Sequence, residues 1–216
     1  MITNILLNTI LPPKCFCCEH DSPNNHLCES CDILCNLVNN PLFLDNNEPA
    51  AIFFYEFSIK KLIQISKFEK SLAHAYVLIN LAKKALQGSF LLKQIKLFEP
   101  QAIVYVPSTY KGLITRGFDI SFLFANILSK TLNCPIDNLL KKPLSSKKMS
   151  SITNKQERLE AIKGSFLLRT SLSNYKRILL VDDVVTTGAT FSECSRMLKK
   201  YSKQIKCLAI AQTPLK

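Results

Sequence analysis

The segment 178–190 constrains the fold of this 216-residue chain more than any other part of it. It begins with four apolar residues starting at Ile178, a pattern typical of a strand buried on both faces of a parallel sheet. Two adjacent carboxylates, Asp182 and Asp183, follow where that strand is expected to end. A turn rich in threonine and glycine comes next, and an amphipathic segment then starts at Phe191. The pattern therefore predicts strand, turn and helix in succession, the repeating unit of open parallel sheets.

The turn combines the features that bind an anion. In an open parallel sheet, ligands bind at the carboxyl ends of the strands. The amide N–H groups that open the next helix favour negative charge. Gly188 permits a backbone conformation that side chains disfavour, and hydroxyls come from Thr186, Thr187 and Thr190. Carboxylates beside such a phosphate cradle indicate a ligand with both hydroxyls and a phosphate, such as a ribose 5-phosphate.

This segment resembles the motif by which type I phosphoribosyltransferases bind 5-phosphoribosyl 1-pyrophosphate (PRPP). In that family an acidic pair holds the ribose 2′- and 3′-hydroxyls, and a Thr/Gly loop wraps the 5′-phosphate. The resemblance implies that Asp182 and Asp183 bind the ribose and act in catalysis. It implies that the 5′-phosphate lies against Thr186, Thr187, Gly188, Ala189 and Thr190.

Two other interpretations of the segment remain, a Walker B-like strand and a buried strand followed by a solvated turn. A Walker B strand needs a partner loop of the form Gly-x-x-x-x-Gly-Lys-[Ser/Thr], and this chain contains none. The positions of the acids, the glycine and the hydroxyls favour the PRPP site.

A second segment also suggests phosphate binding. Residues 101–106 are expected to form a buried strand, and residues 106–112 then supply hydroxyls, a lysine and a glycine that we expect to be flexible. Arg116-Gly-Phe-Asp119 opens the next predicted helix. In type I phosphoribosyltransferases the loop after the first core strand binds pyrophosphate, so the resemblance makes candidates of Ser108, Thr109, Lys111 and Arg116. For any single lysine or arginine, a solvated surface charge is an equally good interpretation.

Six of the nine cysteines fall between residues 15 and 35 and suggest a metal site. Two Cys-x-x-Cys knuckles separated by nine residues can close a tetrahedral zinc site. We predict a structural zinc ion bound by Cys15, Cys18, Cys28 and Cys31. The choice of four stays open to alternatives, since Cys17 can replace one of the first two ligands and His20, His26 or Cys35 can enter. The last three cysteines are expected to be small core residues: Cys134, Cys194 and Cys207.

Charge and hydropathy set the domain organisation. Residues 1–50 carry one lysine and six acids, a net charge of −5, whereas the remainder carries 27 basic and 10 acidic residues, a net charge of +17. A basic body favours polyanionic ligands, although a lysine-rich composition with only a general effect on solubility explains it equally well. No apolar run is long enough for a transmembrane helix. Residues 1–11 lack the features of a signal peptide and are predicted to form a short amphipathic helix, so a cytoplasmic protein is expected.

The remaining pattern alternates strands with helices and predicts an α/β domain with a mostly parallel sheet flanked by helices. We expect helices that begin after Ser58 and that span 71–86 and 120–132, and a mobile polar loop at 143–155. Expected strands are listed together: 50–57, 101–106, 139–142, 166–168, 178–181 and 206–212. Residues 1–50 would form a helix and zinc-knuckle segment, and residues 51–216 the phosphoribosyltransferase-like domain.

Over nearly its whole length the chain resembles the competence protein F (ComF) family. The resemblance rests on three features in this order along the chain: the cysteine knuckles, the Arg116-Gly-Phe helix start and the PRPP motif. Members usually carry Arg-Gly-Phe-Asn where this chain has Asp119. The resemblance implies a role in natural transformation, with PRPP, single-stranded DNA and proteins of the uptake machinery as partners. Aromatic and basic side chains that could contact DNA are Phe53, Phe54, Tyr55, Phe57, Lys60 and Lys61, although their strand-like context favours core packing for most. The alternative is an active transferase that uses Mg²⁺ with PRPP and a nucleobase-like acceptor.

Overall fold

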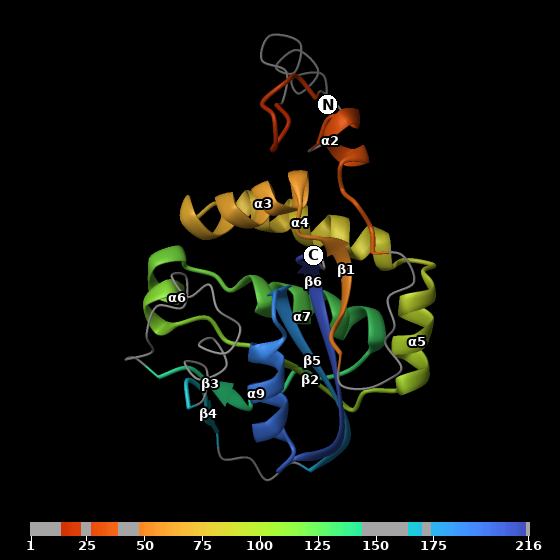
Figure 1. Ribbon diagram of the computed structural model, residues 1–216, viewed down its shortest axis with the longest axis vertical. Coiled ribbons are helices and arrows are strands. Elements are labelled where there is room, and N and C mark those ends of the chain that lie inside the picture. The colour runs from red at the N-terminus through yellow and green to blue at the C-terminus, as the bar shows by residue number, and fades with distance from the viewer. Residues whose placement is uncertain (1–13, 23–26, 39–47, 144–163, 170–173, 215–216) are drawn as a thin grey trace, which may run out of the picture.

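The computed structural model describes residues 14–22, 27–38, 48–143, 164–169 and 174–214. At its centre is a four-stranded parallel sheet with the strand order β1-β6-β5-β2 (Figure 1). Its strands are β1 (Ala50–Phe54), β2 (Ala102–Tyr105), β5 (Tyr175–Val185) and β6 (Ser202–Gln212). A separate antiparallel pair consists of β3 (Leu140–Lys141) and β4 (Leu167–Leu168). The predicted α/β architecture with a parallel sheet is therefore confirmed.

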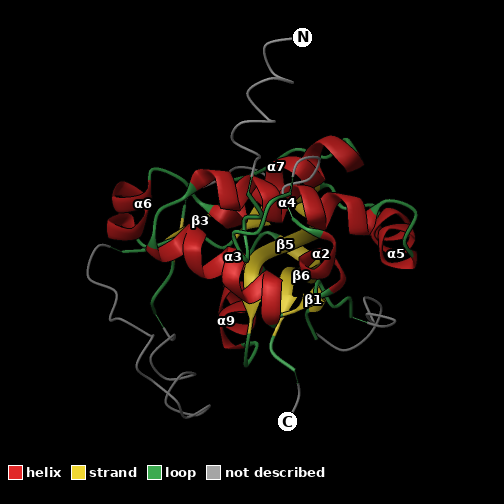
Figure 2. Cartoon of the chain, turned by 90° about the horizontal axis from the view of Figure 1, so that it is seen from above, coloured by secondary structure: helices red, strands yellow, loops and turns green. Residues whose placement is uncertain are grey.

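Helices cover both faces of this sheet. Figure 2 shows α9 (Ala189–Leu198) on one side and α4 (Leu72–Leu86) and α7 (Ile120–Leu132) on the other. The described helices also include α2 (Glu29–Ile33), α3 (Phe57–Phe68), α5 (Phe90–Phe98) and α6 (Tyr110–Arg116). Since each parallel strand must be reached by a crossover connection, the helices come to lie on the two faces of the sheet.

The central strand β5 explains why its sequence is a continuous apolar run. Leu179 and Val181 pack into the hydrophobic cluster that includes α4 and α7, whereas Ile178 and Leu180 pack into the cluster that includes α9. All four side chains are fully buried, because successive residues of a strand point to opposite faces. The three isolated cysteines are buried too, as expected: Cys134, Cys194 and Cys207.

Several predicted boundaries were wrong. The strand expected at 178–181 extends over 175–185, because β6 continues to pair with it past the end of β2. Asp182 and Asp183 therefore lie within β5 rather than after it. The strand expected at 50–57 stops at Phe54, and helix α3 already begins at Phe57.

The predicted helices also need correction. Ser58 does not cap α3, because the N-cap of this helix is Glu56. Ser58 lies within the helix, and its hydroxyl donates a hydrogen bond to the carbonyl of Cys31. Ser71 does cap α4, and α7 spans 120–132 as expected. Helices α5 and α6 were not predicted. Gly112 was expected in a flexible loop but lies within α6, where an added Cβ would approach Thr109 Oγ1 to 2.9 Å.

Two predictions fall on parts of the chain outside the described residues: the amphipathic helix at 1–11 and nearly all of the loop at 143–155. Among the described residues, no helix is long and apolar enough to cross a bilayer.

Candidate functional site

The four predicted cysteine ligands lie together at the end of the molecule where the N-terminal segment projects from the helices (Figure 1). Their Sγ atoms are all within 4.8 Å of one another, and those of Cys18 and Cys28 are 3.5 Å apart. Tetrahedral Zn–S bonds of about 2.3 Å place sulfurs about 3.8 Å apart, so the cluster can hold a metal such as zinc. Cys28 is also the N-cap of the five-residue helix α2, which carries Cys31.

The first knuckle is pre-organised for a thiolate. The amide N–H of Cys17 points at Cys15 Sγ, 3.4 Å away. Burial raises the pKa of the Cys15 thiol, but hydrogen bonds from backbone amides outweigh burial and lower this pKa to about 6. Cys17 itself is turned away and donates to the carbonyl of Ser58, so it does not replace a cluster member.

The cysteine cluster is docked on α3 and α4. The buried Ser58 hydroxyl donates to the carbonyl of Cys31 at 2.8 Å. The ring of His74 in α4 packs edge-on against Phe16, with its Nε2 3.1 Å from the Phe16 carbonyl oxygen. These contacts attach the segment both to α4 and to α3, and α3 also reaches the acidic pair.

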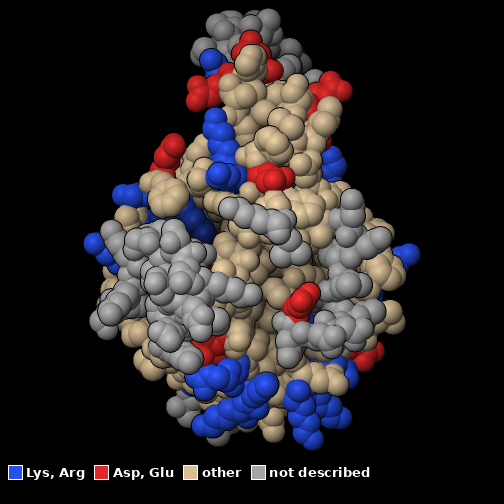
Figure 3. Space-filling view, in the orientation of Figure 1, with Lys and Arg blue, Asp and Glu red and all other residues tan. Residues whose placement is uncertain are grey.

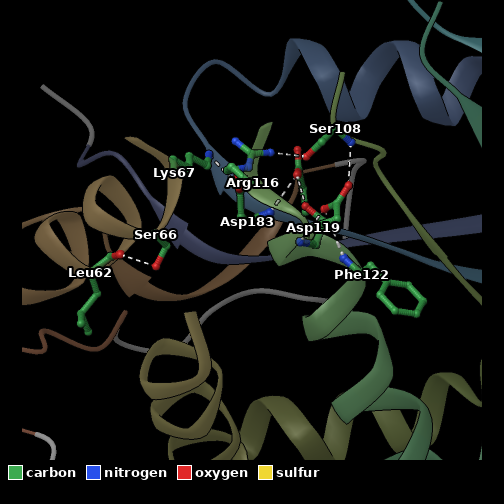
Figure 4. Close-up of polar contacts among 10 residues, drawn as sticks. Leu62, Ser66, Lys67, Ser108, Arg116, Asp119, Phe122 and Asp183 are labelled. Carbon is green, nitrogen blue, oxygen red and sulfur yellow. Dashed lines mark hydrogen bonds and ion pairs between the residues drawn. The ribbon is translucent and has the colours of Figure 1, made fainter. Parts of the chain in front are cut away.

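The acidic pair lies in the part of β5 that extends past β2. Asp182 is buried, and its Oδ1 accepts hydrogen bonds from Ser121 Oγ at 2.9 Å and from the Asp183 amide at 2.8 Å. Burial, reinforced by the neighbouring Asp183 charge, raises the pKa of Asp182 to about 8. Asp183 is more accessible and forms an ion pair with Lys67 of α3, 2.6 Å from Nζ to Oδ2 (Figure 4).

A chain of hydrogen bonds joins the acidic pair to the loop after β2. Ser121 connects Asp182 to Asp119, since its hydroxyl donates to the first carboxylate and its amide to the second. Asp119 caps α7 and also accepts from the Ser108 amide at 2.8 Å (Figure 4). Arg116 Nη2 donates to the Ser108 hydroxyl at 2.8 Å, while its buried Nε has no hydrogen-bond partner among the described residues.

The structure brings together only part of the predicted pyrophosphate set. Ser108 and Arg116 are in direct contact. Thr109 caps α6, and its hydroxyl already accepts the Gly112 amide at 3.0 Å. Lys111 lies exposed on α6. Because this segment folds into a helix, the Thr109 hydroxyl serves as the cap of α6. In the predicted loop it would not have had this structural role.

The predicted phosphate turn connects β5 to α9. Gly188 is the N-cap of α9 with φ +73°, the left-handed region that glycine adopts without strain. Ala189 is buried as the first residue of the helix, and its amide lies 3.4 Å from Thr187 Oγ1. Thr190 is half-buried, and Thr186 lies exposed in the turn. The helix therefore begins with its amides at the carboxyl end of β5.

Two lysines near the acidic pair were missed by the sequence analysis as site residues. Lys67 pairs with Asp183, and Lys142 lies 4.9 Å over the ring of Phe166. Burial lowers the pKa of Lys142, although the charges of Asp182 and Asp183 oppose that decrease. Only the packing of α3 and of the β3 region against β5 reveals them, since both residues are far from the motif in sequence.

Known proteins similar in sequence to this chain include phosphoribosyltransferase domains and competence proteins. Residues 119–214 match the family model "Phosphoribosyl transferase domain". Competence protein F of Haemophilus influenzae is 32% identical over 142 residues, covering 64% of this chain and 61% of that protein. Competence protein ComFC of Streptococcus pneumoniae is 26% identical over 163 residues, covering 75% and 67% of the two chains. The match thus spans less than two thirds of the Haemophilus protein.

Among solved structures, a purine phosphoribosyltransferase from Pyrococcus horikoshii is 20% identical, with a TM-score of 0.37 and coverage of 65% of this chain and 79% of that one. The parallel sheet and the sequence matches indicate a phosphoribosyltransferase domain. This protein therefore contains a phosphoribosyltransferase domain and is a homologue of competence protein F and ComFC.

Proposed function

We propose that this protein binds PRPP at the carboxyl ends of β5 and β2 and works on single-stranded DNA in the cytoplasm during natural transformation. The observation that carries the proposal is the hydrogen-bond chain between the Asp182–Asp183 pair and the Ser108–Arg116 pair. It joins the end of β5 to the segment after β2, the two places that a sugar bearing a 5′-phosphate and a pyrophosphate has to span.

In this assignment, Asp182 and Asp183 bind the ribose hydroxyls, and the phosphate lies against the turn from Thr186 to Thr190. The pyrophosphate is assigned to Ser108 and Arg116, with Thr109 and Lys111 beside them. Arg116 Nε, which has no hydrogen-bond partner within the described part of the chain, supports this choice, because a buried guanidinium N–H without an acceptor is costly unless a ligand supplies one. Mg²⁺ bound with PRPP would neutralise pyrophosphate charge and assist its departure.

Calorimetric titration with Mg-PRPP tests the sugar-phosphate site. Asp183→Ala removes a carboxylate that accepts from the ribose, so the affinity should fall at least about tenfold, the effect of one charge-assisted hydrogen bond. Glu99→Gln is the matched control, because Glu99 is an exposed acid paired with Arg177 on the strand β5 itself. Equal affinity of wild type and Asp183→Ala, or no heat with wild type, would reject the assignment.

Transferase activity is the second candidate function, favoured by the same acidic pair in a phosphoribosyltransferase domain. In the reaction, pyrophosphate leaves C1 of the ribose through an oxocarbenium-like state and the acceptor forms a bond to C1. Pyrophosphate release in the presence of a pool of nucleobases, abolished in Asp182→Ala, would establish it. Release that occurs in neither protein would leave PRPP as a bound ligand only.

We further propose that residues 1–50 form a zinc-bearing appendage and residues 51–216 the phosphoribosyltransferase-like body. The proximity of the four sulfurs supports structural zinc at Cys15, Cys18, Cys28 and Cys31, because four thiolates leave no open coordination position. Such a site stabilises the segment rather than taking part in chemistry.

For the DNA, an open groove along α3 supports a binding surface. It is lined by Phe57, Lys60, Lys61, Gln64, Ile65, Phe68 and Glu69. Phe57 and Phe68 are 58% and 75% exposed, which is unusual for aromatic side chains and leaves their rings free to stack on bases. Of the aromatics expected at this surface, Phe53 is buried in the core, whereas Phe54 and Tyr55 are half-buried. Partners from the uptake machinery are part of the same proposal, supported by the names of the two competence homologues.

A further inference from the structure

The ion pair between α3 and β5 lies directly on the acid that is proposed to bind the ribose. Lys67 Nζ is 2.6 Å from Asp183 Oδ2, and the two side chains are 28% and 15% exposed. Figure 4 shows the lysine reaching from α3 toward the strand. A pair so largely removed from water is held more strongly than a surface pair, because its charges are less screened.

Buried residues other than Lys67 anchor α3. The helix is anchored by Ile59, Leu62, Ile63 and Ser66, each at most 1% exposed. These residues recur at helical spacing on the buried face of α3, which accounts for its packing against α4. The lysine lies in the last turn, where a cation is favoured by the helix dipole, and extends beyond that apolar face to the acid.

The electrostatic surroundings keep this lysine charged. Burial lowers the pKa of Lys67, but the adjacent Asp183 carboxylate, with help from Asp182, more than offsets burial and raises it. Other ionisable groups facing the acidic pair are Tyr55 beside Lys67, Asp119 near Asp183, and Lys142 from the β3 side. Of these groups, Lys67 is the one that forms a direct ion pair with Asp183.

A negatively charged carboxylate at the sugar site, here that of Asp183, repels an incoming sugar phosphate unless a cation neutralises it. We propose that Lys67 is the resident counter-cation of the acidic pair: its ammonium group neutralises the Asp183 carboxylate and holds it in place, so that the ribose phosphate binds without a divalent cation. The inference rests on the proposed PRPP site and adds a positioning residue to it. Without the lysine, a divalent cation has to supply the missing charge.

Ribose 5-phosphate is the appropriate probe, since it carries the diol and the 5′-phosphate but no pyrophosphate that would itself require Mg²⁺. Binding is measured by calorimetry on the full chain, once with EDTA and once with excess Mg²⁺. The variants are Lys67→Met, Lys67→Gln and Lys67→Arg, with Lys84→Met as the control because Lys84 is an exposed lysine of α4. Far-UV circular dichroism verifies that each variant is folded.

We expect wild type, Lys67→Arg and Lys84→Met to bind in EDTA, and the two neutral variants to bind about tenfold more weakly there. Added Mg²⁺ should restore most of the lost affinity in the neutral variants and change wild type little. The restoration separates a lost charge from damaged packing, which Mg²⁺ cannot repair.

Neutral variants that match wild type in EDTA would overturn the inference. So would loss of binding that Mg²⁺ does not restore, or wild type that requires Mg²⁺ for ribose 5-phosphate while still binding Mg-PRPP. Each of these three outcomes would overturn the role of Lys67 but leave the proposed PRPP binding in place. If wild type binds neither Mg-PRPP nor ribose 5-phosphate, the proposed function fails with it.

Discussion

Single side chains decide how the proposed sugar site is charged. Asp119 accepts backbone amides of Ser108, Ser121 and Phe122 through its two oxygens. An asparagine has one acceptor oxygen and a donating NH₂ group in place of the second oxygen, so it could not accept amides at both positions. The acid therefore ties the loop after β2 to the start of α7.

The buried Asp182 predicts a pH dependence of stability. Its pKa is about 8 in the folded protein, compared with about 3.9 in an unfolded chain. The folded state thus holds this proton more tightly, so its contribution to stability is complete below about pH 4 and is lost as pH rises to about 8. Asp182→Asn should flatten the decrease in unfolding free energy between pH 5 and 8, as measured by urea denaturation.

Glu99→Gln is the control, because Glu99 is an exposed acid at the end of α5. This variant should have the same dependence of unfolding free energy on pH as wild type. An identical profile for wild type and Asp182→Asn would show that Asp182 ionises normally.

At the scale of elements, α3 connects the two parts of the protein. Its first turn carries Ser58, which is bonded to Cys31 of the cysteine cluster, and its last turn carries Lys67, which is paired with Asp183. Its outer side lines the groove proposed for DNA. One helix of twelve residues therefore contacts the candidate metal site, the candidate sugar site and the candidate nucleic-acid surface.

The cysteine cluster predicts one zinc ion per chain that stabilises the N-terminal segment. Removing it should unfold that segment, because zinc binding contributes about 10–16 kcal/mol in isolated zinc fingers. Cys28→Ser should lose the metal and lower the melting temperature, as measured by atomic absorption and thermal unfolding. Cys35→Ser is the control, since Cys35 donates to the Cys31 carbonyl and stands outside the four. Zinc retained in Cys28→Ser but lost in Cys35→Ser would show that the ligand set is different.

On the scale of the whole molecule, charge is separated. Figure 3 shows acidic side chains around the projecting N-terminal segment and a concentration of lysine and arginine at the opposite end. Exposed lysines near the amino ends of β5 and β6 include Lys176, Lys199, Lys200 and Lys203. A basic surface attracts polyanions over about a Debye length. For the proposed DNA ligand, this field would assist the approach of DNA to the protein but would not by itself fix where the DNA binds.

DNA binding at the α3 groove predicts two separable effects. The logarithm of affinity for single-stranded DNA should fall with log salt, and changing Lys60 and Lys61 to methionine should reduce that slope by about 1.4, roughly 0.7 per phosphate. Phe57→Ala and Phe68→Ala should each cost about 1–3 kcal/mol with the slope unchanged. Fluorescence anisotropy over a salt series measures both.

The double change of Lys83 and Lys84 to methionine is the matched control, since both are exposed in the last turn of α4 away from the groove. A slope reduced equally by this control would assign binding to general charge, and no salt dependence would reject a lysine track.

The sequence alone indicated the parallel sheet, the cysteine cluster and the glycine turn before α9, because each leaves a recognisable pattern in residues close together in the chain. The apolar run of β5 requires burial on both faces, paired Cys-x-x-Cys motifs fold locally, and Gly188 satisfies a left-handed turn. Only the tertiary structure decided what faces the acids. Lys67 reaches Asp183 across 116 positions of sequence through the packing of α3, and the folding of α6 commits Thr109 to a cap. Such contacts arise from how elements pack in space, which local periodicity does not encode.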